Sequence, residues 1–337
     1  MLRSSRASRR PAALLIPLLL VSTTTAACGE ETTAVSGALS RTDALEVSGE
    51  VGSSPEISWK GKMEASDPET EILIEGEGAA LEDGDQVLVN YYVGNGYTQQ
   101  ATLDTYADEQ VPALFPVGGE VPQPLTAEPT NEQIARYLLD VFIAGEVEAG
   151  DTVGTRKIVT GSSADILGTA GSALDVGNLD ALALVIDIDS VVRSKPDGKP
   201  ALGRPSWVPR IGFADGLPSG LSFDGTSAPD GTLKKQILYP GTGPELAEQD
   251  FIVVDYLGQV FDAAKPFDSS YGRQTLSTTL GQGAVIDGWD QALVGVPVGS
   301  RVMLQIPPDL GYGKQGQGED IPGGSTLYFV IDVLAAG

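Results

Sequence analysis

The run Phe251-Ile252-Val253-Val254-Asp255-Tyr256 opens the C-terminal part of the chain and has the alternating pattern of a half-buried strand. Further marked segments follow it in order, and they are Phe267-Asp268-Ser269-Ser270, Val285-Ile286-Asp287-Gly288-Trp289-Asp290, Val298-Gly299-Ser300-Arg301, Ile306-Pro307-Pro308-Asp309-Leu310-Gly311-Tyr312-Gly313, Ile321-Pro322 and Leu327-Tyr328-Phe329-Val330-Ile331-Asp332-Val333. No single segment is specific for a fold, but the ordered set is.

Composition limits the chemistry that the chain can perform. Its 337 residues are enough for two domains, and 42 Gly with 22 Pro favour turn-rich β structure. A net charge of −25 opposes binding to nucleic acid and to anionic lipid headgroups. We interpret it as a solubility surface, and the alternative is an acidic recognition patch. The chain has no histidine, which excludes Ser-His and Cys-His catalysis and any histidine-ligated metal. A single cysteine, Cys28, excludes an intramolecular disulfide.

Residues 1–27 have the features of a secretory signal peptide. A basic start precedes the apolar run 12–21, which is too short to span a bilayer comfortably. The sequence Thr25-Ala26-Ala27-Cys28 resembles a bacterial lipoprotein cleavage box, which implies that Cys28 is lipidated and anchors the exported chain to the outer face of the cell membrane. The alternative is ordinary secretion after cleavage near Ala27. Residues 28–44 are polar and are expected to form a flexible tether.

The middle of the chain is a diverged copy of its end. One group of matches has an offset of 165 residues and pairs Ile72-Leu73, Gly76, Gly78, Leu81, Asp85, Val89 and Tyr91 with Ile237-Leu238, Gly241, Gly243, Leu246, Asp250, Val254 and Tyr256. A later group, with an offset of 145, pairs Gly150, Val153, Gly154, Arg156, Leu182 and Val185-Ile186-Asp187 with Gly295, Val298, Gly299, Arg301, Leu327 and Val330-Ile331-Asp332. The repeat and the breaker at 196–200 predict one domain at 45–194, a linker with an N-terminal extension at 195–231, and a second domain at 232–337.

The first copy is predicted to contain a long helix in its enlarged middle. Thr130 and Gln133 have the spacing of a capping box. Ile134, Leu138, Val141 and Phe142 then share one helical face, which we expect to pack on the core. The alternative is that this face binds a partner.

The ordered segments resemble the FKBP-type (immunophilin) peptidyl-prolyl isomerases from about Thr232 to the C-terminus. This resemblance implies an α+β protein of two FKBP-like domains, each a twisted antiparallel β-sheet wrapped around a short α-helix. The first copy keeps the ends of this pattern but loses its aromatic residues. Leu167 and Leu184 stand where the second copy has Tyr312 and Phe329, and no tryptophan matches Trp289. The sequence Leu103-Asp104-Thr105 is interpreted as a faded version of Phe267-Asp268-Ser269.

The resemblance also implies a site in the second copy. The residues with catalytic roles would be Trp289 as the floor, Tyr256 and Phe267 as walls, Tyr312 as a hydroxyl donor and Asp268 as a group that orients its polar neighbours. Substrate-binding positions would be Val285, Ile286, Leu276, Ile321 and Phe329, with the Ile286 N–H as a second donor. For an isolated aromatic residue, plain core packing would be the alternative, and Asp268 could serve only as a turn or capping residue.

Prolyl isomerisation needs no nucleophile, because an apolar pocket can favour the twisted amide over its planar forms. We therefore expect a cofactor-free and metal-free isomerase acting on unfolded or secreted proline-containing polypeptides. Macrolide inhibitors of the family would compete for its pocket. The alternative is a non-catalytic chaperone or peptide-binding module that uses the same pocket.

Overall fold

The computed structural model describes residues 41–107, 110–123 and 128–337. The predictions for the leader, for Cys28 and for most of the tether therefore lie outside the described residues. None of the helices that the structure describes has the length and apolar character of a membrane-spanning segment.

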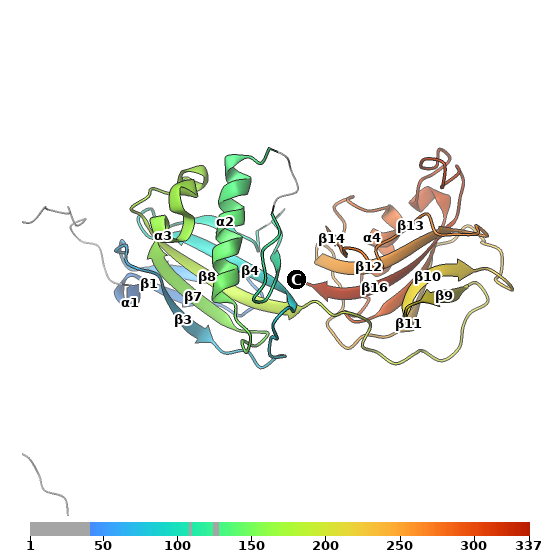
Figure 1. Ribbon diagram of the computed structural model, residues 1–337, viewed down its shortest axis with the longest axis horizontal. Helices are drawn as coiled ribbons and strands as arrows, with labels where there is room; N and C mark the ends of the chain where they lie inside the picture. The colour runs from blue at the N-terminus through green and yellow to red at the C-terminus, as the bar shows by residue number, and fades with distance from the viewer. Residues whose placement is uncertain (1–40, 108–109, 124–127) are drawn as a thin grey trace, which may run out of the picture. The chain divides into compact units, whose positions relative to one another are not determined.

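The described chain forms two large antiparallel sheets with few helices (Figure 1). Neighbouring strands of the first sheet follow the order β3 (Glu69–Ile74), β7 (Arg156–Ser162), β8 (Ala181–Val191), β4 (Gln86–Asn95) and β5 (Gln100–Asp104), with β6 (Ala113–Pro116) also paired to β4. Neighbouring strands of the second sheet follow the order β11 (Lys234–Tyr239), β15 (Arg301–Ile306), β16 (Leu327–Ala336), β12 (Phe251–Val260) and β13 (Asp268–Ser269), with β14 (Leu276–Thr279) also paired to β12. The two sheets thus have the same strand order, and each sheet is six-stranded.

One face of each sheet packs against helices. In the first sheet these helices are α2 (Asn131–Glu146), α3 (Ser163–Leu167) and the 3₁₀ segment η1 (Gly168–Leu174), as Figure 1 shows for α2 and α3. In the second sheet the corresponding helix is α4 (Asp287–Leu293), and a short 3₁₀ segment η2 (Pro308–Leu310) follows β15. The helix in the middle of the first copy is thus 16 residues long and that of the second is seven.

The opposite face of each sheet is covered by a hairpin. In the first sheet it is formed by β1 (Leu45–Ser48) and β2 (Glu56–Trp59), which follow the short helix α1 (Arg41–Ala44). In the second sheet it is formed by β9 (Arg210–Ala214) and β10 (Leu217–Ser222), part of the extension whose place the sequence left open. Here Val208 and Leu221 pack against Leu257, Met303 and Tyr328. Alternate residues of the same strands therefore face the hairpin and the helix.

A buried ion pair joins the same two strands in each sheet. Arg156 on β7 lies opposite Asp187 on β8, with Nε–Oδ1 and Nη2–Oδ2 distances of 2.7 and 2.6 Å. Arg301 on β15 lies opposite Asp332 on β16, and both of its corresponding distances are 2.6 Å. This bidentate geometry satisfies both charges inside the protein and explains why both copies of the repeated pattern keep them.

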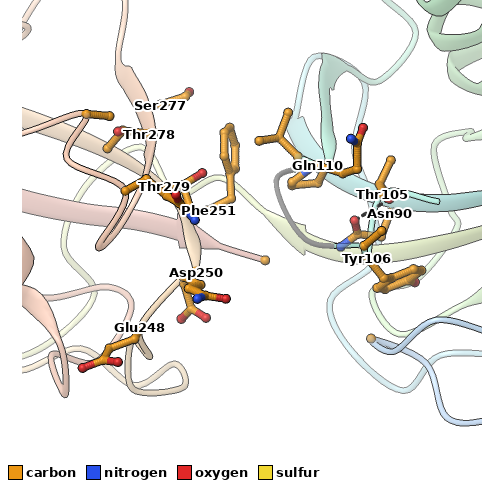
Figure 2. Close-up of a pocket in the computed structure, with 18 residues that line it drawn as sticks. Asn90, Thr105, Tyr106, Gln110, Glu248, Asp250, Phe251, Ser277, Thr278 and Thr279 are labelled. Atoms are coloured by element: carbon orange, nitrogen blue, oxygen red, sulfur yellow. Dashed lines mark hydrogen bonds between the residues drawn. The ribbon is translucent and has the colours of Figure 1, made fainter. Parts of the chain in front are cut away.

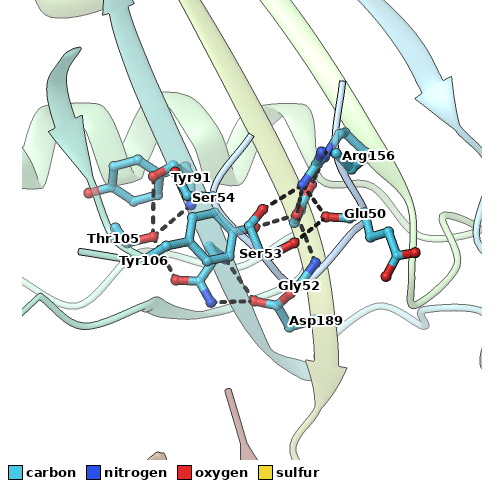
Figure 3. Close-up of polar contacts among 12 residues, drawn as sticks. Glu50, Gly52, Ser53, Ser54, Tyr91, Thr105, Tyr106, Arg156 and Asp189 are labelled. Carbon is cyan, nitrogen blue, oxygen red and sulfur yellow. Dashed lines mark hydrogen bonds and ion pairs between the residues drawn. The ribbon is translucent and has the colours of Figure 1, made fainter. Parts of the chain in front are cut away.

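In the first sheet the pair also secures the loop between β1 and β2. The Arg156 guanidinium donates to the backbone carbonyls of Gly49, Glu50 and Ser53 at 2.9–3.0 Å (Figure 3). Asp187 in turn accepts from the Gly52 N–H at 3.1 Å and from the Tyr106 hydroxyl. Each guanidinium nitrogen of Arg156 has an acceptor, but Asp187 is the only charged one among these described acceptors, so its loss would leave the buried positive charge without compensation.

Replacement of Asp187 by alanine is expected to destabilise the first sheet by about 3–5 kcal/mol, because it leaves the buried Arg156 charge unpaired. Urea unfolding followed by circular dichroism measures this change. The control is Glu46→Ala, which breaks the exposed Lys60–Glu46 pair and should cost less than about 1 kcal/mol. Equal changes in the free energy of unfolding of the two variants would show that the buried ion pair contributes no more to stability than the exposed one.

Candidate functional site

The centre of the site is the pair formed by Trp289 and Phe329. Trp289 lies in the first turn of α4, and Phe329 lies on β16 below it. Their ring centroids are 5.2 Å apart with planes at 89°, which is the favoured edge-to-face geometry. Both side chains are buried, so the pair forms a fixed apolar base.

Two half-buried aromatic residues stand around this base. The Tyr256 ring lies 5.4 Å from Trp289 at 79°, and the Phe267 ring lies 5.7 Å from Phe329 at 83°. Tyr256 comes from β12, and Phe267 directly precedes β13. Four rings from four parts of the chain thus meet in one cluster.

A glycine makes room for these rings. A Cβ at Gly258, on β12, would lie 2.5 Å from Cζ of Phe267 and 2.7 Å from Cε1 of Phe329. Any side chain at this position would therefore displace both rings. Sequence reasoning missed Gly258, because only the pairing of Gly258 with Phe329 across the sheet reveals its role.

The remaining apolar residues of the predicted site belong to, or pack against, the hydrophobic core of the second sheet that contains these rings. Ile321 is buried, whereas Val285, Ile286, Leu276 and Tyr312 are partly exposed. Leu276 is held by the pairing of β14 with β12, in which it lies opposite Val254. Figure 2 shows the far end of this pairing, where Phe251 lies opposite Thr279.

Three donors of the cluster have no hydrogen-bond partner among the described residues. The Trp289 indole Nε1 is buried without a partner, although such an atom costs about 1–3 kcal/mol when it is left unsatisfied. The Ile286 N–H and the Tyr312 hydroxyl also donate to no described residue. Burial and the nearby Asp268 carboxylate raise the pKa of Tyr312, so its hydroxyl keeps its proton. An apolar cluster with free donors is suited to an amide carbonyl.

Asp268 lies at the edge of the cluster and is held by three groups. It accepts from the Tyr256 hydroxyl, from Arg273 Nη2 at 2.9 Å and from the Ser269 N–H at 2.8 Å. Burial opposes its ionisation, but the hydrogen bonds from Tyr256 and Arg273 outweigh burial and lower the pKa of Asp268. The Tyr256 pKa is raised by burial and by the same carboxylate. The sequence had not pointed to Arg273, which lies five residues beyond Asp268 in an irregular segment.

A groove of about 430 Å³ runs along this polar edge. Its lining includes Tyr256, Asp268, Arg273 and Leu276. The structure thus places nine of the ten residues of the predicted site in or against the one hydrophobic core that holds the aromatic rings, with Asp268 bonded to Tyr256. Within the part of the chain that is described, no cluster of His, Cys, Asp or Glu is arranged to hold a metal ion.

The first sheet has aliphatic residues at the corresponding places. On β4, Val93 lies opposite Leu184, where the second sheet has Gly258 opposite Phe329. Leu167 is buried in the core of the first sheet. Two aliphatic side chains therefore occupy the region where the second sheet holds a ring over a glycine.

The faded motif of the first copy is displaced by one residue from our prediction. Thr105 Oγ1 accepts from the Tyr91 N–H at 2.8 Å, as Ser270 Oγ accepts from the Tyr256 N–H at 2.9 Å. Leu103 therefore corresponds to Asp268, which means that the first copy has no carboxylate there. The hydroxyl of Tyr91 instead donates to Asp140 on α2 at 3.2 Å.

Replacement of Arg273 by glutamine should raise the pKa of Asp268, because it removes the positive partner of the carboxylate. Since the pKa of Asp268 in the folded protein lies below its ordinary value of 3.8, the ion pair stabilises the fold above that pH and loses its effect as pH falls through the folded pKa. Carboxyl-carbon NMR titration measures the shift, with Lys265→Gln as a control at a neighbouring lysine. An unchanged Asp268 pKa in Arg273→Gln would contradict this description of the edge.

The part of the chain that forms the second sheet is similar in sequence to known proteins. Residues 243–334 match the family model described as FKBP-type peptidyl-prolyl cis-trans isomerase. FK506-binding protein 1A of Aspergillus fumigatus is 39% identical over 102 residues, which cover 30% of this chain and 90% of that protein. FK506-binding protein 2B of Rhizopus delemar is 49% identical over 86 residues, which cover 25% of this chain and 41% of that protein.

A solved structure gives a similar local match. The crystal structure of FkpA from Escherichia coli is 39% identical to the chain, and the match covers 31% of this chain and 47% of FkpA. Its TM-score of 0.29 is too low to bear on the fold of the whole chain.

Proposed function

The chain belongs to the FKBP-type peptidyl-prolyl cis-trans isomerase family, and from this premise we propose that residues 232–337 accelerate rotation about X–Pro bonds in exported polypeptides. The observation that carries the proposal is the apolar aromatic cluster around Trp289 with three unpaired donors beside it. An apolar surface with hydrogen-bond donors is what rotation of an amide requires, whereas acid–base catalysis would require a group in the cluster that titrates near neutral pH.

The mechanism follows from the resistance of the amide to twisting. Rotation has a barrier of about 18–20 kcal/mol because the twisted state loses resonance. Water stabilises the planar, charge-separated form, so an apolar pocket that excludes water favours the twisted form. In this proposal the proline ring lies on Trp289, between Tyr256 and Phe267, with Phe329 below.

Polar groups at the rim would fix the peptide on either side of the proline. The Ile286 N–H and the Tyr312 hydroxyl would each donate to a substrate carbonyl. Asp268 would remain ionised and hold Tyr256 and Arg273 in place at the edge of the groove. Val285, Leu276 and Ile321 would complete the apolar rim, and the family's macrolide inhibitors would compete for the same space.

Replacement of Trp289 by alanine should abolish most isomerase activity, because it removes the floor of the pocket and admits water. Tyr312→Phe removes one hydrogen bond and should cost about 1 kcal/mol, or roughly fivefold in rate. A protease-free assay on a proline peptide measures both variants in the full chain, with Tyr97→Phe as an exposed tyrosine control.

Circular dichroism must show that Trp289→Ala remains folded, and Trp289→Phe serves as a milder second variant. Wild-type turnover in a folded Trp289→Ala chain would refute the site. Peptide binding by the wild type without any rate acceleration would instead identify a non-catalytic binding module.

The first sheet is proposed to be an FKBP-like domain, residues 45–194, without isomerase activity. Its strand order repeats that of the second sheet. However, the positions that correspond to Gly258, Phe329 and Asp268 are occupied by Val93, Leu184 and Leu103. The first sheet therefore lacks the aromatic floor and the carboxylate of the proposed site.

Inactivity of the first domain should be visible in a full chain that carries both Trp289→Ala and Tyr312→Phe. We expect this chain to isomerise no faster than buffer on an unfolded, proline-limited protein substrate. Turnover that survives in the double variant, and also appears in residues 45–194 alone, would contradict the proposal.

Export and anchoring are proposed from residues 1–28 alone. In a bacterial host, the wild-type chain should partition into the detergent phase, because lipid on Cys28 supplies the apolar anchor. Cys28→Ser should release the chain or leave its precursor uncleaved, and mass spectrometry of the N-terminus measures the lipid. A soluble wild-type chain whose mature N-terminus carries no lipid would favour ordinary secretion.

A further inference from the structure

Helix α2 exposes an apolar stripe that we had expected to pack on the core. Ile134, Leu138 and Val141 are 38%, 37% and 42% exposed, and their spacing of four and three residues places them on one helical face. The face that packs on the sheet carries Ala135, Leu139 and Ile143 instead, and each of these is fully buried. The prediction was therefore wrong for these three residues, although Phe142 does pack against the core.

A groove lies beside the exposed stripe. It has a volume of about 710 Å³ and is formed by loop residues 118–123 together with Tyr137, Val141, Ala144 and Gly145 of the helix. Val141 belongs to both the stripe and the groove, so the two form one continuous surface. We call Ile134, Tyr137, Leu138, Val141 and loop 118–123 the α2 surface.

The fold gives no reason for this stripe to be apolar. Helix α4, which occupies the corresponding place in the second copy, is only seven residues long and has no comparable exposed turns. At exposed helix positions, Glu, Lys and Gln are better helix formers than Ile or Val. Because more than a third of each of these three side chains remains exposed on one face, the apolar stripe points to contact with another molecule.

The charged residues near the apolar stripe indicate which class of molecule could bind there. Within α2 and loop 118–123 the acidic residues are Glu120, Glu132, Asp140 and Glu146. Asp140 accepts from Tyr91 and Glu146 accepts from Thr70, so the exposed carboxylates beside the stripe are Glu120 and Glu132. Arg136 is the single basic residue of these two segments, and it donates to Gln110. With a chain charge of −25, a second copy or an acidic partner would be repelled. The complementary partner is an apolar segment flanked by basic residues.

We propose that the α2 surface holds apolar, basic-flanked segments of unfolded polypeptides, separately from the prolyl pocket of the second sheet. The apolar stripe would contact the side chains of the segment, and the acidic groups would attract its flanks. Such a surface requires no proline in its ligand. It would keep a client polypeptide close to the isomerase site of the same chain and raise the local concentration of its prolyl bonds.

The test uses the full chain and a proline-free probe, so that the prolyl pocket is not involved. The probe is a fluorescein-labelled 16-residue peptide of Leu, Ile and Ala with two lysines at each end, and fluorescence anisotropy measures its binding. The triple variant Ile134→Gln, Leu138→Gln, Val141→Gln keeps good helix formers and should weaken binding at least tenfold. The control Leu179→Gln changes a leucine that is 89% exposed in the same domain, and it should bind as the wild type does.

Further measurements separate charge and folding effects. A peptide with glutamates in place of its lysines should bind at least tenfold more weakly to the wild type. Leu138→Lys, a single substitution, should also weaken binding of the lysine peptide. Circular dichroism checks the fold of each variant, and turnover of a short proline peptide should be unchanged in the triple variant.

Equal binding by the wild type and the triple variant would overturn the proposal, and so would equal binding of the two peptides. A dimer that dissociates in the triple variant, with no peptide bound by the wild type, would identify a second copy as the occupant and would also overturn it. Binding of the proline-free peptide by a chain that shows no isomerase activity would support this proposal while contradicting the proposed function.

Discussion

The site depends on a close approach between β12 and two aromatic rings. Phe267 and Phe329 can lie over the strand only because Gly258 has no side chain, since a Cβ would come within 2.7 Å of both. Phe329 in turn supports Trp289 at 5.2 Å. In the first sheet, Val93 occupies the place of Gly258, and an aliphatic residue replaces the ring opposite it. A glycine on β12 therefore leaves room for the aromatic cluster in the second sheet, whereas the first sheet has aliphatic side chains at the same place.

The features that hold each sheet together are distinct from those that form the site. The buried pairs Arg156–Asp187 and Arg301–Asp332 join equivalent strands and are present in both copies. Along each strand, the Arg and Asp residues of these pairs alternate with the residues whose side chains face the helices. The site could therefore be lost from one copy without loss of the fold, because the two sets of residues lie on different faces of the same strands.

Sequence patterns predicted some features well and others only in part. The capping box was found as expected, with the Thr130 side chain accepting from the Gln133 N–H at 3.2 Å and the Gln133 side chain reaching back at 2.9 Å. The inward face of the same helix was assigned wrongly, because α2 carries two apolar stripes and periodicity alone does not say which one meets the sheet. Gly258 and Arg273 were missed, because their roles depend on neighbours that only the folded sheet brings near.

The three tryptophans allow a direct test of the central claim, that peptides bind on the aromatic cluster of the second sheet. Trp59 packs on the hairpin-covered face of the first sheet, and Trp207 packs on the hairpin-covered face of the second. Trp289 lies in the aromatic cluster, where we propose that it forms the floor of the prolyl pocket. Nitrogen-15 NMR resolves one indole N–H signal from each. On titration with a short proline peptide, the Trp289 signal should shift and saturate while the other two stay in place. A shift of Trp59 or Trp207 with an unmoved Trp289 would contradict the account.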